Sequence, residues 1–259
     1  MQFENILIHD VETSIDEIVD WENYRIGYFN SKNKGKSSKN EDTLFVRSHK
    51  GLLVAGVCDG AGGHPRGRDA SFAASSTIID EKIGDNDFRP LDIIQKINDN
   101  ILNLKSGSAA TLAFVTIKDD DLQCFSVGDA EIILWNAHGR EIYSNVPHSN
   151  IGYQIEAGIM NQEDSLEEDD RYQVNNMLGD QHIRIESTNK ISMKKNQTLI
   201  VGSDGVFDNI SHVELGELIH GSSFDDSFKS IVNRCLDTES EKWIKDDDIA
   251  FLLISKIQA

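Results

Sequence analysis

LLVAGVCDGAGGHPRGRD, residues 52–69, joins an apolar run to a glycine-rich turn. The run LLVAGVC (52–58) is apolar throughout, which is typical of a strand that is covered on both faces. Asp59 follows the run directly, and the glycines of DGAGGH (59–64) let the backbone turn sharply beside that acid. The stretch therefore predicts a buried strand that ends in an acid. Asp59-Gly60 is either a tight turn or the edge of a site, and the rest of the chain has to decide between the two.

The composition is typical of a soluble globular protein, with 259 residues of which 39% are hydrophobic and 27% are charged. The formal net charge of −19 disfavours nucleic acid and anionic membranes, because binding them requires clustered Lys and Arg. No apolar run is long enough to cross a bilayer, and the start MQFENILIHDVE lacks a secretory signal. We therefore expect a cytoplasmic protein that binds neither nucleic acid nor membranes, and we expect a monomer.

Hydrophobic periodicity predicts many strands with helices between them. The expected strands are 24–29, 43–48, 52–58, 109–117, 122–127, 131–136, 198–202 and 249–254. The expected helices are 68–84 with its apolar face at Phe72, Ser76, Ile79 and Ile83, one after Pro90, one opened by the capping box Ser211-x-x-Glu214, and one from Phe224 to Cys235. Short connections favour antiparallel hairpins, so the expected fold class is α+β, with a single domain over residues 1–259.

Acids stand at the ends of the apolar strands. Asp59, Asp129 and Asp204 follow strands, whereas Asp42 and Asp247 precede them. In an antiparallel sheet the end of one strand lies beside the start of its neighbour, so we expect these acids to share one edge of one sheet core. Each Asp-Gly pair alone is also a turn signal. Gathered carboxylates repel one another unless a cation neutralises them, and oxygen ligands without Cys or His favour Mg²⁺ or Mn²⁺.

Other catalytic and binding motifs are incomplete. A P-loop around GKS (35–37) would need glycine at Asn30, and a nucleophile elbow around Ser203 would need glycine at Val201. A dinucleotide fingerprint in the turn after Asp59 would need glycine at Pro65. The three cysteines lie in apolar contexts at wide spacings, which indicates reduced core thiols rather than a disulfide or a zinc site.

The ordered motifs are NED (40–42), DGAGGH (59–64), GSAAT (107–111), VGDAE (127–131), SDG (203–205) and DDIA (247–250). Together they resemble the protein phosphatase 2C family of metal-dependent serine/threonine phosphatases, in its bacterial form. The resemblance spans residues 40 to 250. It implies a four-layer α-β-β-α sandwich with two central antiparallel sheets flanked by helices.

The resemblance also implies roles for individual residues. Asp59 would bridge two Mg²⁺ or Mn²⁺ ions, the Gly60 carbonyl would bind one of them, and Asp204 and Asp247 would complete the pair of sites. Asp42 would act mainly through metal-bound water, and Asp129 would share a third, weaker metal with Asp204. The catalytic residues would then be Asp42, Asp59, Asp204 and Asp247. The implied reaction is hydrolysis of phosphoserine and phosphothreonine in proteins by metal-activated water, with no covalent enzyme intermediate.

The chain departs from the family pattern at the positions that handle substrate. Many members carry an arginine that grips phosphate near the position of Ser37, where this chain offers only lysines, and Lys36 or Lys39 (or Lys34) would substitute as point charges. Ala61 replaces a histidine of animal members, and Glu131 stands where the family's GDSR motif has arginine. These departures keep an alternative open, namely an inactive phosphatase-like module that binds metal or a phosphoprotein partner.

The polar segment 146–180 carries the acidic run EDSLEEDD (163–170). Its periodicity is weak, so we expect a solvated, mobile loop. By the resemblance it corresponds to the family's variable flap beside the active site. Its acids would then repel acidic phosphopeptides and favour basic ones. The expected partners are phosphorylated substrates of a serine/threonine kinase, which implies a role in signalling.

Overall fold

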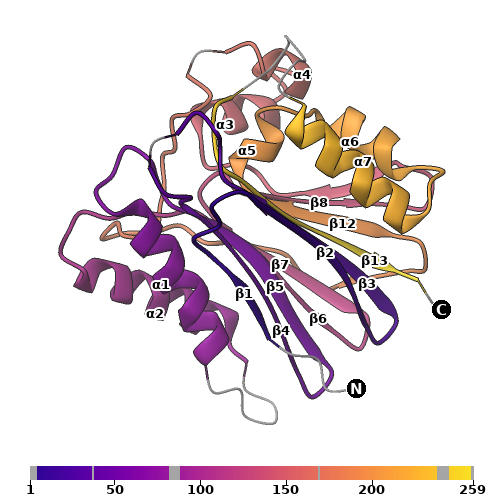
Figure 1. The fold of residues 1–259 in the computed structure, drawn as a ribbon, viewed down its shortest axis with the longest axis horizontal. Coiled ribbons are helices and arrows are strands. Elements are labelled where there is room, and N and C mark those ends of the chain that lie inside the picture. The colour runs from indigo at the N-terminus through magenta and orange to yellow at the C-terminus, as the bar shows by residue number, and fades with distance from the viewer. Residues whose placement is uncertain (1–4, 37, 82–87, 169, 238–244, 258–259) are drawn as a thin grey trace.

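The computed structural model describes residues 5–36, 38–81, 88–168, 170–237 and 245–257. Two antiparallel sheets lie face to face (Figure 1). The first sheet has the order β1 (Ile6–Ile8), β4 (Asp42–His49), β5 (Leu52–Asp59), β6 (Leu112–Lys118), β7 (Asp121–Val127) and β10 (Glu186–Ser187), and β11 (Ile191–Ser192) also pairs with β7. The second sheet has the order β2 (Ser14–Trp21), β3 (Tyr24–Ser31), β13 (Ile249–Lys256), β12 (Thr198–Gly202), β8 (Glu131–Trp135) and β9 (Glu141–Ser144).

Helices cover both outer faces of this pair of sheets (Figure 1). Helices α1 (Gly67–Asp80) and α2 (Pro90–Asn103) pack on the first sheet. Helices α6 (His212–Ile219) and α7 (Phe224–Leu236) pack on the second, together with the short helix α5 (Asp204–Phe207). The α+β fold class and its four-layer α-β-β-α order are therefore confirmed. Within the described ranges, no helix has the length and apolar character needed to cross a bilayer.

Strand β5 shows why its sequence is apolar throughout. Leu53, Ala55 and Val57 face the second sheet and belong to the core between the sheets. Val54 and Cys58 face the other way, into the core beneath α1 and α2. Because both faces of the strand are covered, a polar residue on either face would lose its water without gaining a partner. The predicted buried strand is confirmed.

The predicted acids gather at one end of the sandwich, but they come from both sheets. Asp42 and Asp59 are direct partners at the ends of β4 and β5 in the first sheet. Asp204 follows β12 and Asp247 precedes β13, and these two strands pair in the second sheet. The expectation that one sheet carries all the acids was wrong. The chain returns to the same end of the sandwich in both layers, so two sheets share the acids.

The segment 146–180 is more regular than expected. It contains α3 (Asn150–Glu156) and α4 (Gln162–Ser165). Each helix has a side-chain N-cap, because Ser149 Oγ accepts from the Gly152 amide at 2.9 Å and Asn161 Oδ1 from the Asp164 amide at 2.7 Å. Ile151, Leu166 and Leu178 are buried. The expectation of a solvated loop was wrong for these parts, since the segment packs against the body of the protein.

Candidate metal centre and the adjoining cavity

Asp42 joins the two sheets at the acidic end. Its carboxylate is buried, and Asp42 Oδ2 accepts a hydrogen bond of 2.6 Å from the hydroxyl of Ser203, the residue between β12 and Asp204. The same Ser203 hydroxyl accepts from the Ala250 amide of β13 at 3.0 Å. Burial raises the pKa of Asp42 well above its usual range, and nearby Asp248 raises it further. Ser203 therefore holds an acid of the first sheet against the ends of two strands of the second.

Asp59 and Asp129 are carboxylates held in an unfavourable environment. Burial raises the pKa of each well above its usual range, and the next contributions come from Asp42 on Asp59 and from Asp204 on Asp129. Asp129 Oδ1 and Asp204 Oδ1 are buried and have no hydrogen-bond partner. An unpaired buried carboxylate oxygen is costly, and a cation would remove that cost.

The glycines after Asp59 and Asp204 are required by close packing. A Cβ at Gly60 would lie 2.3 Å from the carbonyl carbon of Gly67, and a Cβ at Gly205 would lie 2.0 Å from the carbonyl oxygen of Asp248. Neither glycine has the positive φ of a hairpin turn. Both Asp-Gly pairs are therefore places where the backbone approaches another segment closely, so the site interpretation of Asp59-Gly60 is favoured over the turn.

Two lysine ammonium groups lie among the acids. Lys36 Nζ is 2.5 Å from Asp247 Oδ1 and 3.4 Å from Asp248 Oδ2. Lys245 Nζ contacts Asp204, and it lies 3.0 Å from Asp208 Oδ2 and 3.2 Å from Asp247 Oδ2. Burial would lower the pKa of both lysines, but the surrounding acids raise it above the usual value. Burial raises the pKa of Asp247, and the two lysines more than offset that effect, so its pKa is lowered.

The two lysines act as counterions that separate the carboxylates of the acid cluster. Within the described ranges, no group of three or more His, Cys, Asp or Glu side chains is already closed around one point as a metal shell. Ammonium groups lie between the carboxylates and neutralise part of their charge. The donor set is nevertheless oxygen-only, and two of its buried oxygens lack a partner, so the residues present fit Mg²⁺ or Mn²⁺.

The two predicted phosphate-binding lysines lie in different surroundings. Lys36 belongs to the acid cluster, and its side chain is 24% exposed. Lys39 pairs instead with Asp10, at 3.1 Å, and is 64% exposed. His64 is exposed, with Nδ1 3.1 Å from the Gly107 carbonyl oxygen. The roles of the predicted site residues stay predictions, and the geometry gives Lys36 the better position of the two lysines.

Sequence reasoning missed the parts played by Asp208 and Asp248. Asp208 ends α5 one turn after Asp204, and burial raises its pKa to about 7, with a further contribution from Asp204. Asp248 is buried and accepts from the Glu41 and Asn33 amides, each at 2.9 Å. The i,i+4 spacing from Asp204 could have indicated Asp208. Nothing in the acidic run at 246–248 distinguishes Asp248 as the residue that anchors a distant loop.

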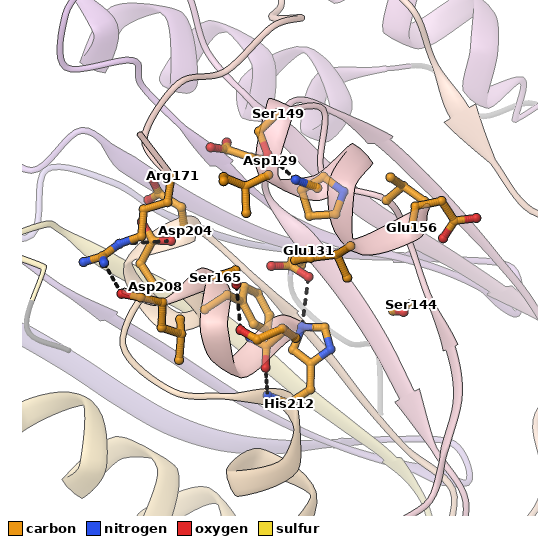
Figure 2. Close-up of a pocket in the computed structure, with 18 of the residues that line it drawn as sticks. Asp129, Glu131, Ser144, Ser149, Glu156, Ser165, Arg171, Asp204, Asp208 and His212 are labelled. Atoms are coloured by element: carbon orange, nitrogen blue, oxygen red, sulfur yellow. Dashed lines mark hydrogen bonds and ion pairs between the residues drawn. The ribbon is translucent and has the colours of Figure 1, made fainter. Parts of the chain in front are cut away.

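A cavity of about 440 Å³ adjoins the acids (Figure 2). Asp129 and Asp204 lie on its wall. Helices α3 and α4 contribute one side, and β8, β9, α5 and α6 contribute the rest. Arg171 and Tyr172 connect the same segment to the acids, since Arg171 Nε lies 4.0 Å from Asp208 Oδ1 and the Tyr172 ring lies 4.9 Å from Lys245 Nζ. The segment 146–180 thus forms one wall of a hollow beside the acid cluster.

The sequence profile of protein phosphatase 2C matches residues 31–247, which contain Asp42, Asp59, Asp129, Asp204 and Asp247. The chain belongs to the protein phosphatase 2C family. The matched range begins at the last residue of β3 and ends at Asp247. It covers the strands from β4 to β12, which belong to both sheets, and the helices on both outer faces of this protein phosphatase 2C chain. No curated protein matches its sequence.

Solved structures share the fold of this protein phosphatase 2C chain at low identity. The serine/threonine phosphatase Stp1 from Staphylococcus aureus superposes with a TM-score of 0.77 and 19% identity over 90% of this chain and 95% of Stp1. The phosphatase PstP/Ppp from Mycobacterium tuberculosis gives a TM-score of 0.73 and 18% identity over 91% and 99% of the two chains. The catalytic domain of PstP with two manganese ions gives a TM-score of 0.71 and 17% identity over 91% and 99%.

Proposed function

We propose that this chain is a single-domain, metal-dependent protein phosphatase that hydrolyses phosphoserine and phosphothreonine in proteins. The observation that carries the proposal is the group of acids at one end of the sandwich, in which buried oxygens of Asp129 and Asp204 have no partner. Such a group is costly unless cations occupy it. Family membership supports phosphoryl chemistry as the use of those cations.

Asp59, Asp204 and Asp247 would hold the principal metal pair with the Gly60 carbonyl, Asp42 would support it through water, and Asp129 would share a further ion with Asp204. The manganese ions bound by PstP support metals of this kind. When bound, such ions neutralise charge on phosphoryl oxygens and lower the pKa of the attacking water.

The chain's own residues supply orientation and charge. Ser203 orients the Asp42 carboxylate by its 2.6 Å hydrogen bond. Lys36 lies among the acids, and its side chain is 24% exposed, so its ammonium group can contact a substrate phosphate. An ammonium group is a point charge and holds one phosphoryl oxygen at a time, whereas an arginine holds two. We therefore expect weaker phosphate binding than an arginine at this place would give.

The test is hydrolysis of para-nitrophenyl phosphate and of a phosphothreonine peptide, with and without Mn²⁺. Turnover should require Mn²⁺ and should fall by about a thousandfold in Asp204→Asn, because a ligand shared by the metals is lost. Asp92→Asn is the matched control, since its carboxylate is 71% exposed on α2, away from the acids. Metal-independent turnover, or an Asp204→Asn variant as active as Asp92→Asn, would contradict the proposal.

The second candidate is a phosphatase-like module that binds metal or a phosphoprotein without turnover. The ion pairs of Lys36 and Lys245 inside the acid cluster favour it, since they neutralise the site without metal. A folded protein that binds Mn²⁺ but hydrolyses neither substrate would support this module instead. For either candidate we propose phosphorylated proteins as partners, a cytoplasmic location, and a monomer.

A further inference from the structure

We propose that the cavity between segment 146–180 and the second sheet is a specificity pocket for a lysine or arginine side chain that flanks the phosphorylated residue of the substrate. The inference rests on the proposed function and adds a substrate class to it. The pocket selects phosphoproteins by a basic neighbour of the phosphoserine or phosphothreonine.

The position of the cavity supports this assignment. Asp129 and Asp204, both in the acid cluster, form part of its wall (Figure 2), and residues of α3 and α4 form another part. A phosphoryl group at the acids would therefore place the next residues of an extended peptide at the mouth of the cavity. A volume of about 440 Å³ is ample for one long side chain.

The walls match the two parts of a basic side chain. Ile151, Ile155 and Val213 contribute apolar surface for an aliphatic stem. Acidic groups also line the cavity: Asp129, Glu131, Glu141, Glu156, Glu163, Asp204 and Asp208. The basic groups on its wall are Arg171 and His212. The lining therefore carries an excess of negative charge, which favours a cation over a neutral or acidic guest.

The two basic groups of the wall already have partners. His212 lies between two glutamates, with Nε2 3.0 Å from Glu131 Oε2 (Figure 2) and Nδ1 3.3 Å from Glu141 Oε2. Arg171 donates to the Leu166 carbonyl and lies near Asp208. Glu131, His212 and Glu141 together carry two negative charges and one positive charge, so this group of three keeps a net negative charge.

The wall of the cavity carries a buried carboxylate oxygen whose charge a cationic guest would offset. Asp129 is 7% exposed, lines the cavity, and has an oxygen, Oδ1, without a hydrogen-bond partner. Glu131 contributes a further carboxylate to the same wall, so the pocket has the charge complementary to a basic side chain.

The test uses phosphothreonine peptides that differ at one position, scanned over the residues before and after the phosphothreonine, with Arg, Ala or Glu at that position. At one position or more, the wild type should show a kcat/KM for the Arg peptide about tenfold above that for the Glu peptide. Glu131→Gln combined with Glu141→Gln should bring this ratio near one. Val213→Arg, at an exposed wall position, should reverse the preference.

Glu168→Gln is the matched control, because Glu168 is an exposed acid of the same segment that does not line the cavity. It should keep the wild-type ratio. A ratio lost equally in Glu168→Gln would overturn the pocket and assign the preference to the general charge of the segment. So would the absence of any Arg preference while para-nitrophenyl phosphate is hydrolysed.

Equilibrium binding separates this inference from the proposed function. Fluorescence anisotropy with the Arg and Glu phosphopeptides measures the pocket without turnover. If neither para-nitrophenyl phosphate nor any peptide is hydrolysed, but the Arg peptide binds about tenfold more tightly, the phosphatase proposal fails and the pocket stands. Equal binding of the two peptides would overturn the pocket, and so would a preference for the Arg peptide that the double substitution leaves unchanged.

Discussion

At the scale of the residue, Lys245 lies among the acids as a counterion. Its ammonium group contacts three carboxylates, and its side chain is 11% exposed. Any metal at Asp204 and Asp247 has to compete with this tethered cation. We therefore expect the lysine to stabilise the protein in the absence of metal and to weaken metal binding by the same contacts.

Lys245→Gln should lower the free energy of unfolding by about 3 kcal/mol without metal, because three partly buried carboxylates lose their counterion. The same change should tighten Mn²⁺ binding by about tenfold or more. Urea denaturation and titration calorimetry measure the two effects. Lys190→Gln is the control, since the pair of Lys190 with Asp121 is exposed, and we expect less than about 0.5 kcal/mol there. Weaker Mn²⁺ binding in Lys245→Gln would exclude competition.

His212 should make the stability of the protein depend on pH. Burial lowers the pKa of His212, but Glu131 and Glu141 more than offset this and raise it from 6.5 to about 9. The folded state therefore holds the proton more tightly, so the stabilisation is complete below pH 6.5 and disappears as the pH rises through 9. It is on the order of 3 kcal/mol. In thermal unfolding, the wild type should have a higher Tm than His212→Gln, and this difference in Tm should narrow from pH 7 to pH 10. A Tm difference that does not change with pH would contradict a charged His212 between Glu131 and Glu141.

At the scale of the element, the sequence predicted strands better than helix faces. The apolar pattern of 52–58 is sufficient for β5, because both faces of this strand are covered. The face predicted for α1 was wrong. Ala70, Ala74 and Ile78 face the sheet, whereas Phe72 is 39% exposed. Small residues bring this helix close to the sheet, and periodicity weighted by large apolar side chains misses them. Ile83 lies outside the described residues.

The sequence did not predict strands β1, β2, β9, β10 and β11, and most of these are short, although β2 has eight residues. Strands β10 and β11 are two residues long, too short for any alternation to be recognised. Helices α3 and α4 are indicated by their caps, Ser149 and Asn161, rather than by an apolar stripe. The segment 146–180 is ordered by contacts with the body of the protein, and local sequence patterns do not predict such contacts.

The junction between β5 and α1 depends on close packing at Gly60. Gly60→Ala would place a methyl group against the backbone of Gly67, so we expect a loss of about 2 kcal/mol in the free energy of unfolding and weaker metal binding. Gly63→Ala is the control, because nothing lies within 4 Å of a Cβ there. Urea denaturation of both variants measures the difference. Equal stability of the two variants would mean that the junction tolerates a side chain.

At the scale of the whole molecule, the acids form a group only because two sheets end at the same place. The strand-end positions of Asp42, Asp59, Asp129, Asp204 and Asp247 were readable from the sequence. Their division between the sheets was not, since pairing of distant strands decides it. The position of Lys245 among them was also not readable, because a lysine beside three acids looks like an ordinary surface charge.

Metal should therefore stabilise the whole fold. At a Mn²⁺ concentration about 100 times its dissociation constant, we expect a gain of about 2.7 kcal/mol in the free energy of unfolding. Asp59→Asn should be more stable than the wild type without metal, because a buried, repelled charge is removed, and should gain little from Mn²⁺. Thermal unfolding with and without Mn²⁺ measures both, with Asp92→Asn as control. A full Mn²⁺ shift in Asp59→Asn would remove Asp59 from the metal centre.

The hydrogen bond from Ser203 to Asp42 crosses from one sheet to the other at their acidic end. The distance between the acids of the two sheets therefore depends on how thick the core between the sheets is. Leu199 and Val57 fill that core from opposite sheets without belonging to the acid cluster. A larger or smaller side chain at either position would change the spacing of the acids. The volume of side chains in the core therefore determines how far apart the acids of the two sheets lie.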